Sequence, residues 1–242
     1  MVGRWPHGVL MLHGLGLGIV SAAAFVPEIP TTGLTNHYLS GTGVTESSSL
    51  VSAWADQVGS RGLAEATNKP TIVASQIDGY PSIRFDGVND ILKDTSGNKA
   101  QGFHVFMVLN QISWTANDHV FSESTDVFNP ALEQQTTSPQ LAINGSAASA
   151  TGGATLGTWS LIGTYFSGTS SYVQVNGTKG TVGGGTASDF SGGIALGGRG
   201  ASVACSNVEF AEVAIYSSER TGTPLDDIEA YFAAKYPTLS IA

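Results

Sequence analysis

Cysteine and basic residues are both scarce in this sequence. Its one cysteine, Cys205, permits no disulfide within the chain and no thiolate cage for a structural zinc ion. Ten lysines and arginines are set against nineteen acidic residues, and no basic run occurs that could follow a phosphate backbone. These absences exclude a disulfide-stapled fold and make nucleic acid a poor partner, so stability must come from packing.

Charge as a whole is also low, and apolar residues are plentiful. Of the 242 residues, 41% are hydrophobic and only 12% are charged, with a formal net charge of −9. Disordered chains show the opposite balance. All-β domains commonly exceed 200 residues as one unit, so the sequence predicts one large globular domain at 31–242 with an appendage at 1–30.

The first thirty residues differ from the rest. Arg4, an apolar stretch and a run of alanines follow one another in the order of a secretory signal, but glycines interrupt the apolar stretch. A membrane span would need about 20 predominantly apolar residues. Alternating leucine and glycine has a period of two, which is typical of an extended strand. We therefore expect an uncleaved docking arm, with a cleaved signal peptide or an unstructured tail as alternatives; the expected docking residues are Leu12, Leu15, Leu17, Ile19 and Val20.

From residue 31 onward, short β-branched and aromatic runs alternate with glycine, serine, threonine and asparagine. This pattern is typical of an antiparallel β-sandwich. Asn176-Gly177 predicts a type I′ hairpin turn, and the small-residue stretches at 145–157 and 180–193 predict surface loops. The expected strands are 71–75, 81–86, 103–109, 119–123, 140–143, 158–166, 171–175, 193–197 and 207–216.

One helix is expected, near the C-terminus. Thr223 can cap it, Pro224 suits its first position, and Pro237 ends it. Leu225, Ile228, Phe232 and Tyr236 follow helical spacing, which predicts that one apolar face packs against the sheet.

Six segments together resemble the concanavalin A-like lectin/glucanase domains of the laminin-G-like type, in versions common in bacteriophage virion proteins and bacterial surface proteins. The resemblance covers about 32–238 and is carried by LVSAWADQVG (50–59), NKPTIVAS (68–75), IDGYPSIRFDGVNDIL (77–92), YVQVNGTKG (172–180), IALGGR (194–199) and FAEVAIYSSERTGTPLDDIEAYFAAKYP (210–237). It implies an all-β, two-sheet antiparallel jelly-roll sandwich with a short C-terminal helix, behind the N-terminal extended arm. Such domains often bind carbohydrate and often serve only as protein modules.

The sequence contains none of the common catalytic motifs of this and other enzyme families. The glucanase branch of the family carries E-x-D-x-x-E on one strand, whereas Glu209 and Glu212 are three residues apart, a spacing that places side chains on opposite faces of a regular strand. No G-x-S-x-G, HExxH or Walker loop occurs. His104 and His119 fall in or beside apolar strands and are interpreted as sheet residues. The sequence therefore predicts a protein that is not an enzyme.

Two weaker sites remain open. Trp114 beside Asn117 and Asp118 has the aromatic and polar groups of a glycan contact, although the tryptophan could equally cover the end of the sandwich. Asp86, Asp90 and Asp94 are candidates for calcium, although their spacing is not that of an EF-hand. We otherwise expect no cofactor.

The leading functional hypothesis is a non-enzymatic bacteriophage virion protein, a capsid decoration or tail appendage at the virion surface. In it, the arm would dock on other virion proteins in many copies, and the lectin-like domain would face host-surface polysaccharide. The alternative is a secreted or surface-attached bacterial carbohydrate-binding module, and a glycosidase with diverged carboxylates is the third possibility.

Overall fold

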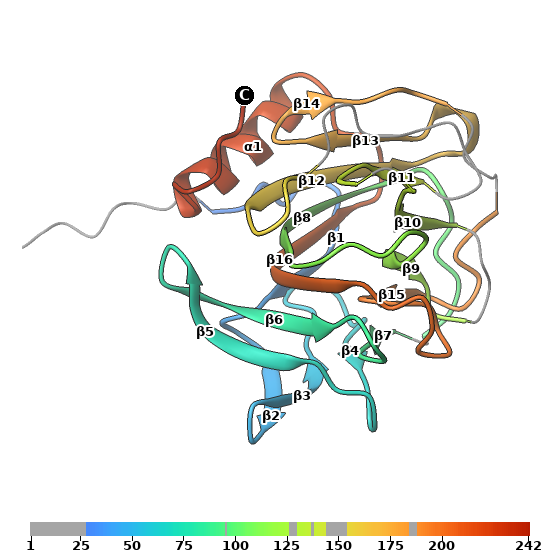
Figure 1. Ribbon diagram of the computed structural model, residues 1–242. Coiled ribbons are helices and arrows are strands. Elements are labelled where there is room, and N and C mark those ends of the chain that lie inside the picture. Colours follow the sequence, from blue (N-terminus) through green and yellow to red (C-terminus); the bar gives the residue numbers. More distant parts are fainter. Residues whose placement is uncertain (1–27, 95, 126–129, 137, 144–153, 184–187) are drawn as a thin grey trace, which may run out of the picture.

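The structure is a computed structural model that describes residues 28–94, 96–125, 130–136, 138–143, 154–183 and 188–242 (Figure 1). Most of the described chain is antiparallel β-structure, as the sequence predicts. A single α-helix, α1 (Thr223–Lys235), is found in this part of the chain, together with a 3-10 turn, η1 (Gly168–Ser170). The five residues expected to form the docking arm lie outside the described ranges. No helix in the described ranges is long and apolar enough to cross a membrane.

Within the described ranges, sixteen strands form one continuous hydrogen-bonded ladder, in the order β11-β10-β9-β15-β7-β4-β3-β5-β6-β16-β8-β12-β13-β14, with β1 added to β16 and β2 added to β3. The strands are β1 (Leu34–Leu39), β2 (Val44–Ser47), β3 (Leu50–Trp54), β4 (Leu63–Ala64), β5 (Thr71–Ile77), β6 (Tyr80–Asp86), β7 (Leu92–Lys93), β8 (Phe103–Gln111), β9 (His119–Glu123), β10 (Ala131–Gln134), β11 (Leu141–Ile143), β12 (Trp159–Phe166), β13 (Tyr172–Val175), β14 (Thr178–Lys179), β15 (Ile194–Leu196) and β16 (Asn207–Tyr216).

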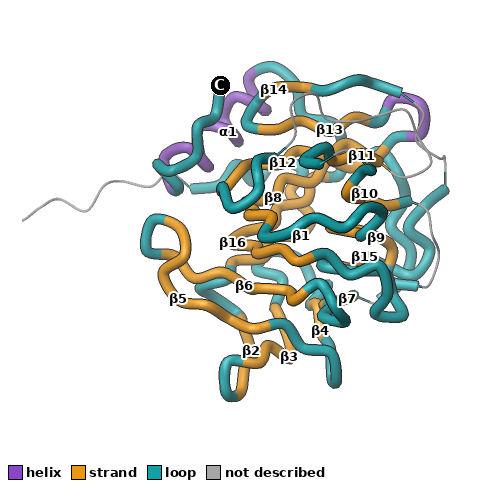
Figure 2. The backbone as a smooth tube through the Cα atoms, viewed as in Figure 1, coloured by secondary structure: helices purple, strands orange, loops and turns teal. Residues whose placement is uncertain are grey.

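The main core lies between strands that are far apart in the order of this ladder. Alternate residues of β8 and β16, such as Val105, Met107 and Val213, are buried in one cluster with Phe121 of β9 and Leu132 of β10. Strands far apart in the ladder therefore face each other across the same core. Figure 2 shows the strands stacked in this way with the connecting loops gathered around their ends.

A second core lies on the other side of β8 and β16, under α1. Phe106 and Tyr216 of the strands pack with Ile228 and Phe232 of the helix, and the C-terminus lies beside that helix in Figure 1. The apolar spacing therefore predicts the docked face correctly. The helix begins one residue earlier than expected, because Gly222 occupies the cap position, with no side-chain cap hydrogen bond, and Thr223 is already helical.

A buried carboxylate fastens α1 to the sheet. Glu212 of β16 accepts hydrogen bonds from the Tyr231 hydroxyl (2.7 Å), the Tyr236 hydroxyl (2.7 Å) and Lys235 Nζ (2.6 Å), and its Oε1 lies 2.6 Å from His37 Nε2 of β1. We call these five residues the Glu212 cluster. Its carboxylate side chain is fully buried.

Each of the nine expected strands is present, with shifts of one or two residues at some ends. The Asn176-Gly177 hairpin is also confirmed, because these residues join β13 to β14 with φ angles of 48° and 83°. Seven strands were missed: β1, β2, β3, β4, β7, β10 and β14. Three of them, β4, β7 and β14, contain only two residues each, too few for an alternating pattern.

The two glutamates of β16 do not lie on opposite faces, so that expectation is wrong. The register of β16 against β8 shifts between Phe210 and Glu212, which leaves Ala211 as an extra residue. Val208, Phe210 and Val213 face the main core, so Glu209 and Glu212 both face away from it. Glu209 pairs with Arg84, whereas Glu212 is held in its own cluster. The three-residue spacing of Glu209 and Glu212 is therefore no valid reason to exclude hydrolysis, because β16 is not a regular strand at this point.

Candidate functional site: a polar pocket around Arg61 and Lys99

A polar pocket opens at the end of the fold where β1 and β8 begin and β16 ends. Its walls come from these strand ends, the loop that joins β3 to β4, and residues 98–102 before β8. Its volume is about 470 Å³, within the range of small-molecule sites. The lining residues are Thr35, Asn36, Gly59, Ser60, Arg61, Asn98, Lys99, Ala100, Gln101, Phe103 and Ser217.

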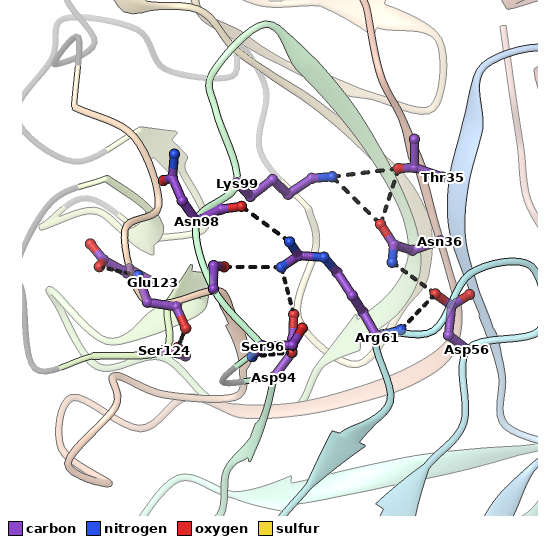
Figure 3. A network of polar contacts seen from close by, with 12 residues as sticks. Thr35, Asn36, Asp56, Arg61, Asp94, Ser96, Asn98, Lys99, Glu123 and Ser124 are labelled. Atoms are coloured by element: carbon purple, nitrogen blue, oxygen red, sulfur yellow. Dashed lines mark hydrogen bonds and ion pairs between the residues drawn. The ribbon is translucent and has the colours of Figure 1, made fainter.

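Arg61 ties two walls of the pocket together (Figure 3). Its Nη1 donates to Asp94 Oδ2 (2.9 Å) and to the carbonyl oxygen of Gly97 (3.0 Å), and its Nη2 donates to the carbonyl oxygen of Asn98 (3.1 Å). A guanidinium presents its donors in a fixed planar fork, so one side chain can hold both loops in place. The charge of Arg61 is thus engaged by Asp94, which is almost fully buried.

Asp56 organises the opposite wall. Its carboxylate accepts hydrogen bonds from Asn36 Nδ2 (2.8 Å) and from the backbone N–H groups of His37 (2.9 Å) and Val58 (3.1 Å). Burial by itself raises the pKa of Asp56, but backbone hydrogen bonds, chiefly from His37 and Gly59, outweigh it and hold the pKa below its usual value. Asp56 is therefore an ionised residue that orients the Asn36 amide toward the pocket.

Lys99 is the less engaged cation of the pocket. Its Nζ lies 3.4 Å from Thr35 Oγ1 and 3.5 Å from Asn36 Oδ1, both neutral oxygens at long range, and 4.9 Å from the centre of the Phe103 ring. No carboxylate within the described ranges forms an ion pair with it. Burial, with Arg61 as the second cause, lowers the pKa of Lys99 to about 8, although Asp56 and Asp94 act in the other direction. The amine is therefore mainly protonated at pH 7 but poorly compensated.

The remaining polar groups differ in how firmly they are held. Gln101 is fixed, because its backbone N–H donates to Asp189 Oδ1 (2.9 Å) and its Oε1 accepts from the Gly168 N–H (2.6 Å). Ser60 and Ser217 are exposed residues at the rim of the pocket. The pocket thus combines a rigid base with exposed hydroxyl-bearing residues.

The residues expected to contact glycan lie elsewhere. Trp114 is partly buried against the main core, and its Nε1 donates to the carbonyl oxygen of Gln135 (2.7 Å). Asn117 is exposed in a turn with a φ of 70°, and burial raises the pKa of Asp118 to about 6. These contacts are those of a tryptophan that closes the end of the core. Glycan binding at Trp114, Asn117 and Asp118 stays a prediction.

The three aspartates considered for calcium have separate partners. Asp86 Oδ1 accepts from the N–H groups of Val88 (2.8 Å) and Asn89 (3.2 Å), and Asp90 Oδ2 accepts from the Asp86 N–H (3.0 Å), so both fasten their own turn. Asp94 binds Arg61 instead. Across the part of the chain that the structure describes, no three His, Cys, Asp or Glu side chains are grouped so as to hold a metal ion. Calcium stays an untested prediction.

The two histidines interpreted from the sequence as sheet residues, His104 and His119, are buried. Burial lowers the pKa of His104 to about 3 and that of His119 to about 4, so both rings are neutral at pH 7. His104 Nδ1 accepts from the backbone N–H of Arg220 (3.2 Å), and the ring packs against Phe106. His104 is therefore part of the sheet packing.

No protein-family model matches the chain, and no curated protein matches its sequence. Similar folds do occur among solved structures. Trypanosoma rangeli sialidase in complex with sialic acid matches with a TM-score of 0.61 and 14% identity, over 86% of this chain and 34% of the sialidase chain. A GH54 α-L-arabinofuranosidase soaked with a cyclic sulfate inhibitor matches with a TM-score of 0.55 and 13% identity, over 77% of this chain and 51% of that chain. The chain therefore spans about a third of the one protein and half of the other.

These matches correct the functional hypothesis drawn from the sequence. The prediction of a non-enzymatic bacteriophage virion protein is contradicted, because solved structures of similar fold include carbohydrate-processing enzymes, a sialidase and an arabinofuranosidase. The prediction that the protein is not an enzyme is contradicted by the same finding. At 13–14% identity, what the likeness establishes for this chain is the β-sandwich fold found in such proteins.

Sequence reasoning missed the pocket because its residues come from three segments that are distant along the chain. Thr35 and Asn36, Ser60 and Arg61, and residues 98–101 meet only when β1, β8 and β16 align their ends. A shift in the register of β1 between Leu34 and Asn36 also disturbs the alternation of that strand. The available signal was the scarcity of basic residues: two of only ten, Arg61 and Lys99, line this pocket from loops that also contain glycine.

Proposed function

We propose that this chain is a carbohydrate-recognition domain of a carbohydrate-processing enzyme, built on a concanavalin A-like jelly-roll sandwich of two sheets. The observation that carries the proposal is the open polar pocket around Arg61 and Lys99. It is large enough for a small ligand and is lined by hydroxyl, amide and ammonium groups. A polysaccharide is the natural partner for such a site.

The lining groups match the chemistry of a sugar ring. Each sugar hydroxyl both donates and accepts hydrogen bonds, as do the hydroxyls of Ser60 and Ser217, while the amides of Asn36 and Gln101 are held by protein partners and shape the walls. Arg61, Asp56 and Asp94 hold the walls in place without a ligand. Binding to a preformed site costs less ordering entropy, which favours affinity for a small polar ligand.

The comparisons support a role as one part of a larger protein. Proteins that match this fold include a sialidase, crystallised in complex with sialic acid, and an arabinofuranosidase. The chain matches 34% and 51% of those chains, which is the proportion expected of one module. Both proteins act on carbohydrate, and the proposal extends that substrate class to the pocket of this chain.

A blocking variant tests the location of the site. Ser60→Trp places an indole at the rim of the pocket, and Ser47→Trp places the same side chain at an exposed position of β2 as a matched control. Soluble oligosaccharides titrated into the isotopically labelled full chain should shift the signals of residues 98–101 in wild type and in Ser47→Trp, but not in Ser60→Trp. Binding that survives Ser60→Trp and is lost in Trp114→Ala would move the site to Trp114.

A further inference from the structure

We propose that the pocket selects sugars that carry a carboxylate, and that Lys99 is the residue that recognises this group. The inference rests on the proposed carbohydrate function of the same pocket and adds the class of sugar. The observation behind it is that the Lys99 ammonium group has two neutral oxygen atoms, of Thr35 and Asn36, as its polar neighbours.

Lys99 differs from the other engaged cations of the chain. Arg61 reaches Asp94 at 2.9 Å, Lys235 reaches Glu212 at 2.6 Å, and Arg84 contacts Glu209. Within the described ranges, the Lys99 ammonium has polar contacts with the Thr35 hydroxyl and the Asn36 amide oxygen, at 3.4 and 3.5 Å, besides the Phe103 ring at 4.9 Å. It therefore has the capacity for a short, charge-assisted hydrogen bond to an anion that enters the pocket.

The neighbouring carboxylates do not take this role. Asp94 is bound by Arg61, and Asp56 is bound by Asn36 and by backbone N–H groups, as Figure 3 shows. Asp189, beside the pocket, is bound by the Asn98 amide and the Gln101 backbone. Each of these carboxylates is held by its own partners. A ligand carboxylate would supply the partner that Lys99 lacks.

The other lining groups favour a sugar acid over a bare anion. The hydroxyl-bearing residues Ser60 and Ser217 lie around the same cavity of about 470 Å³, which exceeds what a simple anion would fill. These groups can bind ring hydroxyls while Lys99 binds the carboxylate. A uronic acid combines both features in one ring.

The test compares ligands that differ only in charge. Methyl glucuronoside, its methyl ester and methyl glucoside would be titrated into the full chain and followed by NMR, with sodium acetate at equal concentration as the simple anion. We expect the acid to bind about tenfold or more tightly than the ester, as one charge-assisted hydrogen bond would give. Lys99→Gln should abolish this preference, whereas Lys99→Arg should retain most of it. Lys69→Gln, a half-buried lysine outside the pocket lining, is the matched control and should bind as wild type does.

The pH dependence gives a second readout. The charged groups that face Lys99 are Arg61, Asp56 and Asp94, and the pKa of Lys99 itself is about 8. Affinity for the acid should fall as pH rises through about 8, while affinity for methyl glucoside should not change.

The outcomes separate the two proposals. Equal affinity for acid and ester, or a preference that survives Lys99→Gln, overturns the role of Lys99 and leaves carbohydrate binding in place. Acetate that binds as tightly as the glucuronoside overturns the assignment to a sugar acid. If none of the saccharides binds, the proposed function itself fails.

Discussion

Two regions of this protein bring lysine and carboxylate groups together, and they do so differently. In the Glu212 cluster, four donors lie within 2.7 Å of one carboxylate, and its side chain has no exposure to solvent. In the pocket, the Lys99 ammonium lies 3.4 Å or more from its two polar neighbours and borders an open cavity. In the Glu212 cluster the carboxylate has four close partners, whereas in the pocket the Lys99 ammonium can still donate a short hydrogen bond.

The difference separates a structural role from a binding role. A buried carboxylate with a full set of short hydrogen bonds stabilises the docking of α1. Removing one of its partners leaves a buried polar or charged group unpaired, which costs a large desolvation free energy. A half-buried ammonium with weak contacts contributes little to the fold but can gain a partner. Residue composition alone cannot distinguish the two roles, because both networks contain a lysine, at least one acidic residue and an aromatic ring.

The largest effect should follow from removing the centre of the first network. Glu212→Ala leaves Lys235 and two tyrosine hydroxyls buried without their acceptor, so the free energy of unfolding should fall by about 3–5 kcal/mol. Denaturant unfolding measures this loss. Asp227→Asn, an exposed acid on the same helix, should stay within about 0.5 kcal/mol of wild type. A loss below about 1 kcal/mol for Glu212→Ala would mean that the cluster does not fasten the helix.

Acid should weaken the same cluster. Burial raises the pKa of Glu212, but the hydrogen bond from His37 and the charge of Lys235 outweigh it and hold the pKa below the usual 4.5. A depressed carboxyl pKa contributes stability above its unfolded value and loses it as pH falls through the folded value. Wild type should therefore lose stability more steeply than Glu212→Gln below pH 4.5. Parallel curves for the two proteins would contradict this.

Much of the fold was predictable because local patterns determine it. The β-branched and aromatic runs of β8 and β16, the Asn176-Gly177 turn and the spacing of Ile228 and Phe232 each express a local preference that packing then uses. Strands of two residues carry no such pattern. The extra Ala211 in β16 was also invisible, because a bulge depends on the register against β8 and not on the residue itself.

The pocket was not predictable for a different reason. Glycan binding was predicted at Trp114 because this aromatic residue lies in a polar loop, yet its side chain packs against the main core. Arg61 and Lys99 are 38 positions apart, and their meeting depends on how the loops before β4 and β8 converge. Tertiary convergence of loop residues leaves no local pattern in the sequence.

A variant of intermediate effect tests how the pocket is held open. Asp94→Asn removes the charge that anchors Arg61 while keeping the side-chain shape, and a hydrogen bond to a charged group is typically worth about 1.5–3 kcal/mol. Arg61 is 27% exposed, so the loss should fall at or below the lower end of this range. Calorimetric unfolding would measure it, and NMR should show signals of residues 96–101 shifting together. Unchanged loop signals would show that Arg61 does not couple the two walls.

The smallest effect should come from Lys99, and its sign is informative. At pH 7, Lys99→Gln should be at least as stable as wild type, since the amine makes only long contacts and burial disfavours its charged form. The folded-state pKa of Lys99 is about 8, against a usual value of 10.5, so the unfolded chain binds more protons between these two pH values. Stability rises with pH wherever the unfolded state binds more protons, so wild type should gain stability relative to Lys99→Gln from pH 8 to 10.5. Other titrating groups cancel in the difference between the two proteins. A flat difference would mean that the Lys99 ammonium is as well hydrated in the fold as in the unfolded chain, and the pocket would then have no poorly compensated cation to offer a sugar acid.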